Sequence, residues 1–285
     1  MAAVLNVSKP SHQLLCGVCA QKEKMGREKG LWEAFHTYIT RYGTVPEAFW
    51  SWRPDNFQKI GNRCQTRRGD TALIYGDGNA MDQIVKQIDT AERFTRFSQV
   101  VDRSIREACH EALYRHCPPV DGKIPADILL LGGDDLVVYL SADRAMAFAI
   151  DIARLFEEKT RSALTSDQPD PFFKNILGDN GLTLSIGVAV GRSHTPIAIM
   201  SDQAEELLKS AKQKGAALAG TSSYIPPCID FHLTSQFNEV GVAASRKHHP
   251  IFRTFQGEHR LLYQGPHTLA EAEALIEAAH SLKSG

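Results

Sequence analysis

Two glycine- and aspartate-rich segments carry the residue types needed for metal-dependent chemistry. Residues 76–79 (Gly-Asp-Gly-Asn) follow the β-rich run TALIY, and residues 132–135 (Gly-Gly-Asp-Asp) join two further β-rich runs. If these strands lie side by side, Asp77 meets Asp134 and Asp135. Clustered carboxylates repel one another unless a hard cation neutralises them, and Mg²⁺ or Mn²⁺ prefers oxygen ligands. We therefore expect these three aspartates to hold the metal and to be catalytic.

The chemistry that fits such a site is nucleotidyl transfer. Two ions about 3.5 to 4 Å apart would activate an attacking hydroxyl and stabilise a pyrophosphate leaving group. Glycines let a triphosphate lie against the backbone, and a lysine on the helix before the last strand supplies a positive charge for its phosphates. The residues expected to bind the nucleotide are Gly76, Gly78, Asn79, Gly132, Gly133 and Lys212.

Each of these signals has a plainer alternative. Glycine and aspartate are among the commonest turn residues, so residues 132–135 could form an ordinary hairpin turn. A lysine on a helix is usually solvated surface. The second acid-bearing segment at Asp77, in the topologically matching place, favours the catalytic interpretation.

The spacing of apolar residues predicts the elements that position the site. A strand is expected at 71–75 with a loop beginning at 76, a long helix broken once over 81–117, and a hairpin over 127–141 with a four-residue turn. A helix follows over 142–160, then a loop over 162–180, a strand from 182, a helix from 197 or 202 to 214 capped by Gly215, and a strand at 229–233. This order, β-α-β-β-α-β and then α-β, predicts an α+β fold of the ferredoxin-like type, with helices on one face of an antiparallel sheet and the other face open for a ligand.

At these residues the chain resembles the palm domain of the large polymerase-like subunit of type III CRISPR complexes, a distant relative of the GGDEF nucleotidyl cyclases. The resemblance covers roughly residues 71–235. It rests on Asp77-Gly78-Asn79, the hairpin LLLGGDDLVVY, the strand LTLSIGVAVG and the helix AEELLKSAKQKG. Four motifs in the same order are far more specific than any one of them.

The resemblance implies that Asp77, Asp134 and Asp135 hold the metals and that ATP is the substrate. It further implies cyclic or linear oligoadenylate second messengers as products, and a role in antiviral signalling. GGDEF relatives make a cyclic dinucleotide from GTP, but their acidic motif ends in Glu-Phe where this chain has Asp135-Leu136. We therefore expect ATP, with a diguanylate-cyclase-like enzyme that uses GTP as the alternative.

The chain also departs from that family. The large CRISPR subunit has two palms and a His-Asp nuclease region, whereas this sequence is long enough for one palm and shows no such nuclease region. Cyclisation needs two nucleotides held face to face. The simplest arrangement is a C2 homodimer, or pairing with another palm protein. A second alternative is a non-catalytic palm that binds a nucleotide or a partner palm, with RNA or protein contacted by the N-terminal region.

Three domains are expected: a zinc-ribbon-like and helical module over 1–70, the palm over 71–235, and an extension over 236–285. Cys16 and Cys19 fit one zinc knuckle, and Cys64 lacks a cysteine partner at either knuckle spacing. A structural zinc site needs four ligands, so His12 or His36 would have to complete it. The alternative is three ordinary thiols. The extension ends in a helix opened by a capping box of Thr268 and Glu271.

Irregular segments are the candidates for regulation. We expect control at 162–181 and 240–265, because long loops near a scaffolded site commonly carry it. The basic run Arg246 to His249 could bind phosphates or a regulatory RNA, although a solvated basic loop is the preferred interpretation.

Bulk properties exclude several classes of protein. With 43% hydrophobic and 23% charged residues, the chain can bury a core and is not disordered. A net charge of -1 and a pI near 6.8 argue against a general nucleic-acid-coating protein and leave room for a local basic patch. Six cysteines in 285 residues are too few for a disulfide scaffold. Since no apolar run approaches a membrane span and the start lacks a signal peptide, we expect a cytoplasmic protein without a membrane partner.

Overall fold

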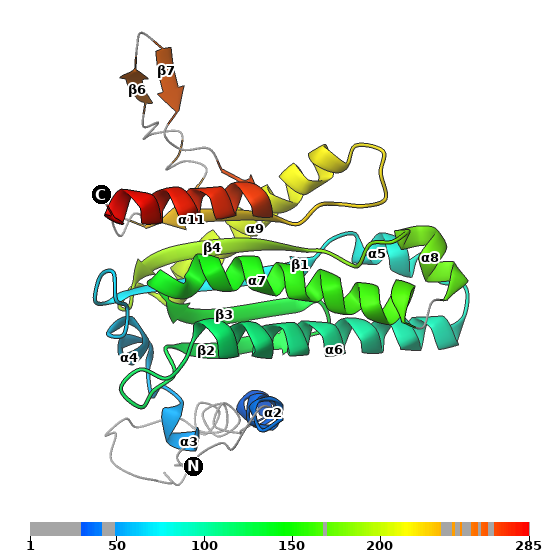
Figure 1. Cartoon of the computed structure of the whole chain (residues 1–285), viewed down its shortest axis with the longest axis horizontal. Coiled ribbons are helices and arrows are strands. Elements are labelled where there is room, and N and C mark those ends of the chain that lie inside the picture. The colour runs from blue at the N-terminus through cyan, green and yellow to red at the C-terminus, as the bar shows by residue number, and fades with distance from the viewer. Residues whose placement is uncertain are drawn as a thin grey trace, which may run out of the picture. The chain divides into compact units, whose positions relative to one another are not determined.

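A six-stranded sheet with helices packed on it makes the mixed α+β fold that the sequence predicts (Figure 1). The structure is a computed structural model, and it describes residues 30–41, 49–167, 170–234, 241–242, 246, 252–255, 258–261 and 265–284. Strand order across the sheet is β2-β3-β1-β4-β5-β8. The strands are β1 (Asp70–Gly78), β2 (Ala126–Gly132), β3 (Asp135–Ser141), β4 (Leu184–Arg192), β5 (Cys228–Leu233) and β8 (His267–Thr268).

The central strand β1 pairs antiparallel with both β3 and β4, and β2 pairs antiparallel with β3. Beyond β4 the sheet changes direction, since β5 runs parallel to β4 and β8 antiparallel to β5. The connections carry the helices α5 (Met81–Val85), α6 (Ala91–His116), α7 (Ala142–Arg161), α8 (Pro171–Leu177) and α9 (Ile197–Ala219), and α11 (Leu269–Ser284) follows β8. The central strand thus has the carboxylate-bearing hairpin on one side and β4 on the other.

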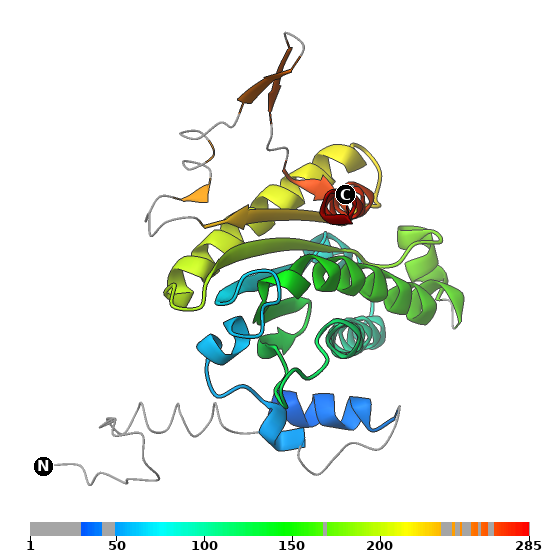
Figure 2. The same ribbon diagram turned by 60° about the vertical axis from the view of Figure 1, so that its left-hand side comes forward.

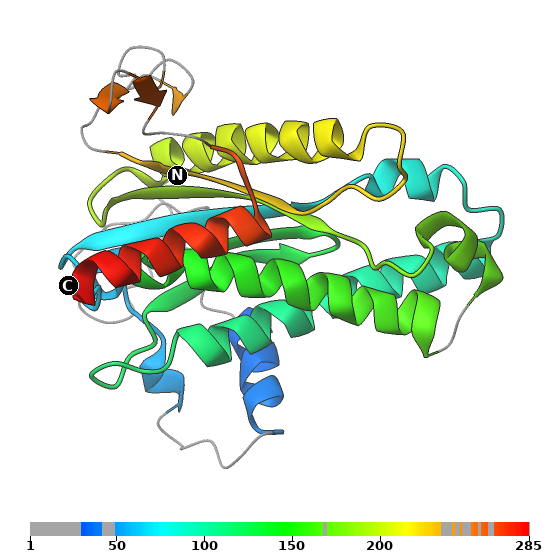
Figure 3. The ribbon, with the colours of Figure 1, turned by 45° about the horizontal axis from the view of Figure 1, so that its top comes forward.

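Helices lie on both faces of the sheet, which corrects the expectation of an open face. Figure 3 shows α6, α7 and α11 on one side and α9 on the other. The short helix α4 (Phe57–Gly61) shares the α9 side, where Ile60 packs in one cluster with Leu73, Tyr139 and Leu207 (Figure 2). The apolar side of α9 is buried against one face of the sheet, over β4, β5 and β1. At β2 this face stays accessible, and Leu130 is 45% exposed.

Local sequence signals account for most helix ends. The long helix predicted over 81–117 is broken once, between α5 and α6, and Thr90 caps α6 by accepting from the Arg93 backbone N–H. The predicted loop over 162–180 was wrong in part: it contains a π-helical turn η1 (Ser162–Ser166) and α8. Asp170 caps α8 and Pro171 opens it, a combination that starts helices.

Gly215 is not the C-cap of the helix that carries Lys212. That helix, α9, continues to Ala219 and ends at Gly220, whose φ is 56°. A Cβ on Gly215 would lie 2.9 Å from the carbonyl oxygen of Pro226, so the glycine permits close packing inside the helix.

The chain divides into two compact units, Met1–Val45 and Pro46–Gly285. The first contains the helix α2 (Gly30–Ile39), which lies in the module expected to be zinc-ribbon-like and helical. The second contains α3 (Phe49–Trp52) and α4, which the sequence assigned to the N-terminal module. It also contains the strands β6 (Phe252–Phe255) and β7 (Glu258–Leu261), which pair with each other.

The end of the chain follows its sequence signals. The capping box is present, because the Glu271 carboxylate accepts from the Thr268 N–H at 2.7 Å and the Thr268 hydroxyl accepts from the Glu271 N–H at 3.3 Å. None of the described helices is long and apolar enough to cross a membrane.

Arg246 is an internal ion-pair partner, which corrects its interpretation as part of a solvated or phosphate-binding loop. Its guanidinium donates to both carboxylate oxygens of Asp230, at 2.8 and 2.9 Å, and Asp230 is fully buried. A buried carboxylate needs such a partner. The rest of that basic run, residues 247–249, lies outside the described residues.

Candidate active site

The segment around Asp77 belongs to a strand, not to a loop as predicted. β1 continues to Gly78, because Gly76 still pairs with Leu136 of β3 and Asp77 pairs with Ser185 of β4. Extended backbone fixes the direction of the Asp77 side chain. The carboxylate therefore projects from the end of β1, where the strand still pairs with β4.

The hairpin between β2 and β3 is tighter than the predicted four-residue turn. Gly132 and Asp135 form the last pair of the ladder, so only Gly133 and Asp134 make the turn. Gly133 has a φ of +64°, a conformation that favours glycine. The turn sets Asp134 at the tip and Asp135 at the first position of β3.

Asp77 and the hairpin acids interact, as the sequence predicts for neighbouring strands. Burial, and then the negative charge of Asp77, raise the pKa of Asp134 above its ordinary value. The same two causes raise the pKa of Asp135, and Lys212 opposes them. The carboxylate of Asp134 also lies beside Gly78, since a Cβ there would be 2.9 Å from its Oδ2. The positive charge near these carboxylates is therefore too small to offset their burial and mutual repulsion.

Lys212 reaches the same place from α9. Its ammonium group donates to Oδ2 of Asp77 at 2.6 Å and to the carbonyl oxygen of Gly78 at 2.9 Å. About a third of each side chain in this ion pair is exposed. A phosphate approaching the end of β1 would meet a positive charge held against the backbone.

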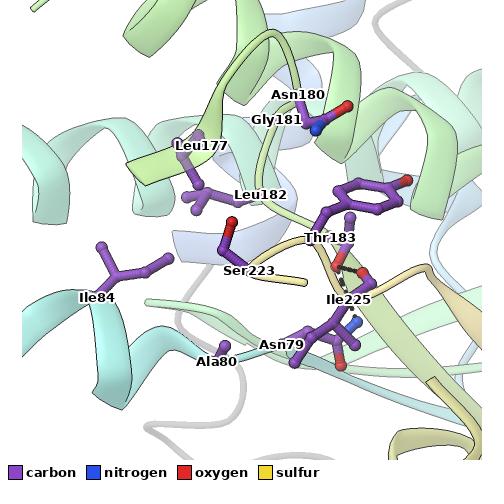
Figure 4. Close-up of a pocket in the computed structure, with 11 residues that line it drawn as sticks. Asn79, Ala80, Ile84, Leu177, Asn180, Gly181, Leu182, Thr183, Ser223 and Ile225 are labelled. Atoms are coloured by element: carbon purple, nitrogen blue, oxygen red, sulfur yellow. Dashed lines mark hydrogen bonds between the residues drawn. The ribbon is translucent and has the colours of Figure 1, made fainter. Parts of the chain in front are cut away.

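Asn79 has a different surrounding from the one expected of a nucleotide ligand. It is buried, its amide nitrogen donates to Thr183, and its carbonyl oxygen accepts from Ser185. Figure 4 shows it at a cavity also lined by Ile84 and Ile225. The cavity volume is about 20 Å³, enough for one water. Asn79 ties β1 to β4, and a nucleotide contact of its side chain stays a prediction.

Two residues of α6 that the sequence does not assign to the site, Asp102 and Arg106, lie at the hairpin turn. The Gly133 N–H donates to Oδ1 of Asp102 at 3.1 Å, and Arg106 Nε donates to Oδ2 at 2.9 Å. The hydrogen bond from Arg106 lowers the pKa of Asp102, against desolvation, and the Gly133 N–H adds to the lowering. The four-residue spacing of an acid and a base was visible in the sequence, but its contact with the hairpin was not.

Mg²⁺ or Mn²⁺ fits the donor chemistry of this site, because burial and mutual repulsion penalise the charges of the carboxylates. In the described parts of the chain, however, no group of three or more His, Cys, Asp or Glu side chains is arranged to hold a metal. Lys212 forms an ion pair with Asp77. The metal roles of Asp77, Asp134 and Asp135 stay predictions.

The zinc site also stays a prediction. Cys16, Cys19 and His12 lie outside the described residues. Cys64 is described and buried, and its sulfur lies 3.3 Å from the hydroxyl of Thr66.

The part of the chain that contains this site matches the model of a known protein family. The model of the family described as "Cas10/Cmr2, second palm domain" matches residues 70–219, from the start of β1 to the end of α9. The chain belongs to this family. The Cas10/Cmr2 palm thus includes Asp77, both hairpin acids and Lys212, and the resemblance to the large type III CRISPR subunit is confirmed. No curated protein matches the chain.

Solved structures that resemble the chain include structures of Csm1 proteins. They include the Csm1–Csm4 cassette in complex with cA4, at 18% identity and a TM-score of 0.44, with 56% of this chain and 21% of that chain covered. Others are the Csm1–Csm4 subcomplex of the type III-A CRISPR-Csm interference complex (20%, 0.43, 56% and 21%) and Csm1 in T. onnurineus (20%, 0.42, 56% and 22%). The chain spans about a fifth of the length of those chains.

Proposed function

We propose that the chain is a Mg²⁺- or Mn²⁺-dependent nucleotidyltransferase that converts ATP into a cyclic or linear oligoadenylate. The observation that carries the proposal is the convergence of Asp77, Asp134 and Lys212 at the end of β1, beside the backbone of Gly78. Membership of the Cas10/Cmr2 palm family supports it, as does the order of β2, β3, β1 and β4, which suits a ferredoxin-like palm.

The residues of the site would have three roles: binding phosphate, letting the triphosphate approach the backbone, and holding cations. Lys212 would bind a phosphate oxygen, since its ammonium is fixed by the Gly78 carbonyl. Gly78 and Gly132 would let the triphosphate approach the backbone. Asp77, Asp134 and Asp135 would hold the cations, which when bound activate the acceptor hydroxyl and stabilise the leaving pyrophosphate.

We further propose that synthesis requires two palms. Each nucleotide must serve as acceptor for the other in a cyclising reaction, whereas the described chain carries one Gly-Gly-Asp-Asp hairpin. A C2 homodimer, or a pair with another palm protein, would supply the second site. Activity should then fall faster than protein concentration on dilution, and full activity of a demonstrated monomer would contradict this part.

The test is incubation of the purified protein with each labelled NTP and Mg²⁺ or Mn²⁺, with mass spectrometry of the products. Asp134→Asn/Asp135→Asn should abolish turnover. A matched control is Asp121→Asn/Asp202→Asn, which also removes two aspartate charges, both from exposed positions away from the hairpin tip. Consumption of GTP in place of ATP would favour the diguanylate-cyclase-like alternative.

One observation favours a second candidate, a palm that binds a nucleotide without turning it over. Lys212 forms an ion pair with Asp77 at 2.6 Å, so Asp77 could bind a cation only after this pair opens. Calorimetry with ATP and Mg²⁺ separates the two candidates. Binding without product at any protein concentration or NTP would establish the second.

A further inference from the structure

The hairpin tip is held from outside the sheet by a side chain of α6. In a two-residue turn, the N–H of Gly133 lies outside the ladder that ends at Gly132 and Asp135. Asp102 supplies its acceptor at 3.1 Å, across 31 residues of sequence. The turn and the helix are therefore connected directly.

Both the backbone and the carboxylate of Asp102 are held in place by neighbouring groups. Its backbone belongs to a 26-residue helix whose neighbouring residues Val101 and Ile105 are buried in the core. Its second carboxylate oxygen accepts from Arg106 Nε at 2.9 Å. The Arg106 guanidinium also lies against the turn, since a Cβ on Gly132 would be 3.3 Å from its Nη2. Both side chains thus face the Gly132–Gly133 backbone.

We propose that Asp102, held by Arg106, is a positioning residue that fixes the Gly133–Asp134 turn and so determines where the Asp134 carboxylate meets Asp77. Asp134 directly follows the residue whose N–H Asp102 binds, and its carboxylate lies beside Gly78. A shift of this turn by one ångström is enough to lower the rate of an enzyme about 100-fold. This inference rests on the proposed function for its effect on turnover, but not for its effect on the turn.

If the role of Asp102 were purely structural, replacing it would lower the stability of the fold. The Asp102 and Arg106 side chains are 43% and 36% exposed, and ion pairs at such positions add little to stability. Replacing Asp102 should therefore leave the thermal midpoint within about 2 °C of wild type. Positioning predicts that the turn loosens while the fold keeps its stability.

The variants are Asp102→Leu, which removes the acceptor, and Asp102→Asn, which keeps an acceptor oxygen but loses the charge that pairs with Arg106. The matched control is Asp89→Leu, because Asp89 forms the same kind of four-residue pair with Arg93 at the start of α6. The first measurement is amide hydrogen exchange at Gly133 in protein labelled with ¹⁵N-glycine. We expect exchange roughly tenfold faster in Asp102→Leu, intermediate in Asp102→Asn and unchanged in Asp89→Leu.

The second measurement is turnover of ATP with Mg²⁺. Asp102→Leu should lower kcat about 100-fold and also raise KM for ATP, because a displaced Asp134 would hold the ATP-bound cation less well, and Asp102→Asn should recover part of both losses. Wild-type exchange at Gly133 in Asp102→Leu, or full kcat despite faster exchange, overturns the inference.

If the wild-type protein turns over no NTP, the proposed function fails, and calorimetry of ATP binding with Mn²⁺ replaces turnover. Binding weakened together with faster Gly133 exchange then supports the inference. Binding unchanged in Asp102→Leu overturns it.

Discussion

Lys212 lies 2.6 Å from Asp77, although 135 residues separate the two in the sequence. The contact joins α9 to the end of β1. It places a lysine ammonium group in direct contact with one of the carboxylates of the site.

Replacing Lys212 should impair the site more than the fold. Lys212→Met removes the charge that opposes repulsion among the aspartates and would bind phosphate, so we expect nucleotide turnover to fall by roughly 10- to 100-fold. Stability should change by less than about 1 kcal/mol, because the pair is partly exposed. Steady-state kinetics and thermal unfolding check both expectations. Lys59→Met, which breaks the pair between Lys59 of α4 and Asp55, is the control and should keep full activity.

The two glycines that flank Asp77 offer a sharper test of the carboxylate arrangement. A Cβ on Gly78 would lie 2.4 Å from Met81 and 2.9 Å from Asp134 Oδ2, so Gly78→Ala must displace a carboxylate oxygen. A Cβ on Gly76 would lie 2.9 Å from a methyl carbon of Leu136 instead. Both variants should lose about 1 to 3 kcal/mol of stability from overpacking. Only Gly78→Ala should lose turnover about 100-fold further, and equal activity of the two variants would refute this.

Neighbouring strands made the acidic site predictable. An acid at the end of one strand and acids at the tip of a hairpin come together in a sheet in which β1 lies beside β3. Lys212 was expected near phosphates because its helix precedes the last strand. Hydrogen bonds between side chains and residues far apart in the sequence were not predictable. No sequence pattern indicates that Asp102 contacts Gly133, or that Arg246 contacts Asp230.

Glycine was the least reliable signal because it serves several purposes. Gly215 was expected to end a helix, but it permits contact with Pro226 inside α9. Gly76 and Gly78 were expected to begin a loop, but they remain in β1. Because glycine has no side chain, it permits both close backbone packing and turns. Only the residue that packs against it shows which of the two purposes it serves.

The capping box of α11 should make stability depend on pH. The hydrogen bond from Lys214, and then the Thr268 N–H, lower the pKa of Glu271 from 4.5 to about 2. Its charged form therefore stabilises the folded state above pH 4.5, and this contribution is lost as the pH falls toward 2. Glu271→Gln should cost about 1 kcal/mol at neutral pH, since the side chain is half exposed.

Thermal unfolding of both proteins from pH 7 to pH 2 measures this contribution. The difference between them should shrink as the pH falls below 4.5. Glu277→Gln, which alters an exposed glutamate of the same helix, should track wild type throughout. A constant difference for Glu271→Gln would mean that its charge is not the cause.

Contact between α9 and the sheet depends on a glycine of β4. A Cβ on Gly187 would lie 2.0 Å from the Ala204 carbonyl oxygen and 2.5 Å from the Leu208 nitrogen, both backbone atoms of α9. Gly187→Ala should therefore push the helix off the sheet, with a loss of about 3 kcal/mol or more in the free energy of unfolding. Gly191→Ala, in the same strand, meets its nearest atom, Thr195 Oγ1, at 3.3 Å and should lose less than about 1 kcal/mol. Denaturant unfolding of the two variants compares them directly. Because Lys212 is carried on α9, Gly187→Ala should also lose nucleotide binding under conditions where it remains folded, and retention of wild-type binding would show that Lys212 can reach Asp77 without this contact.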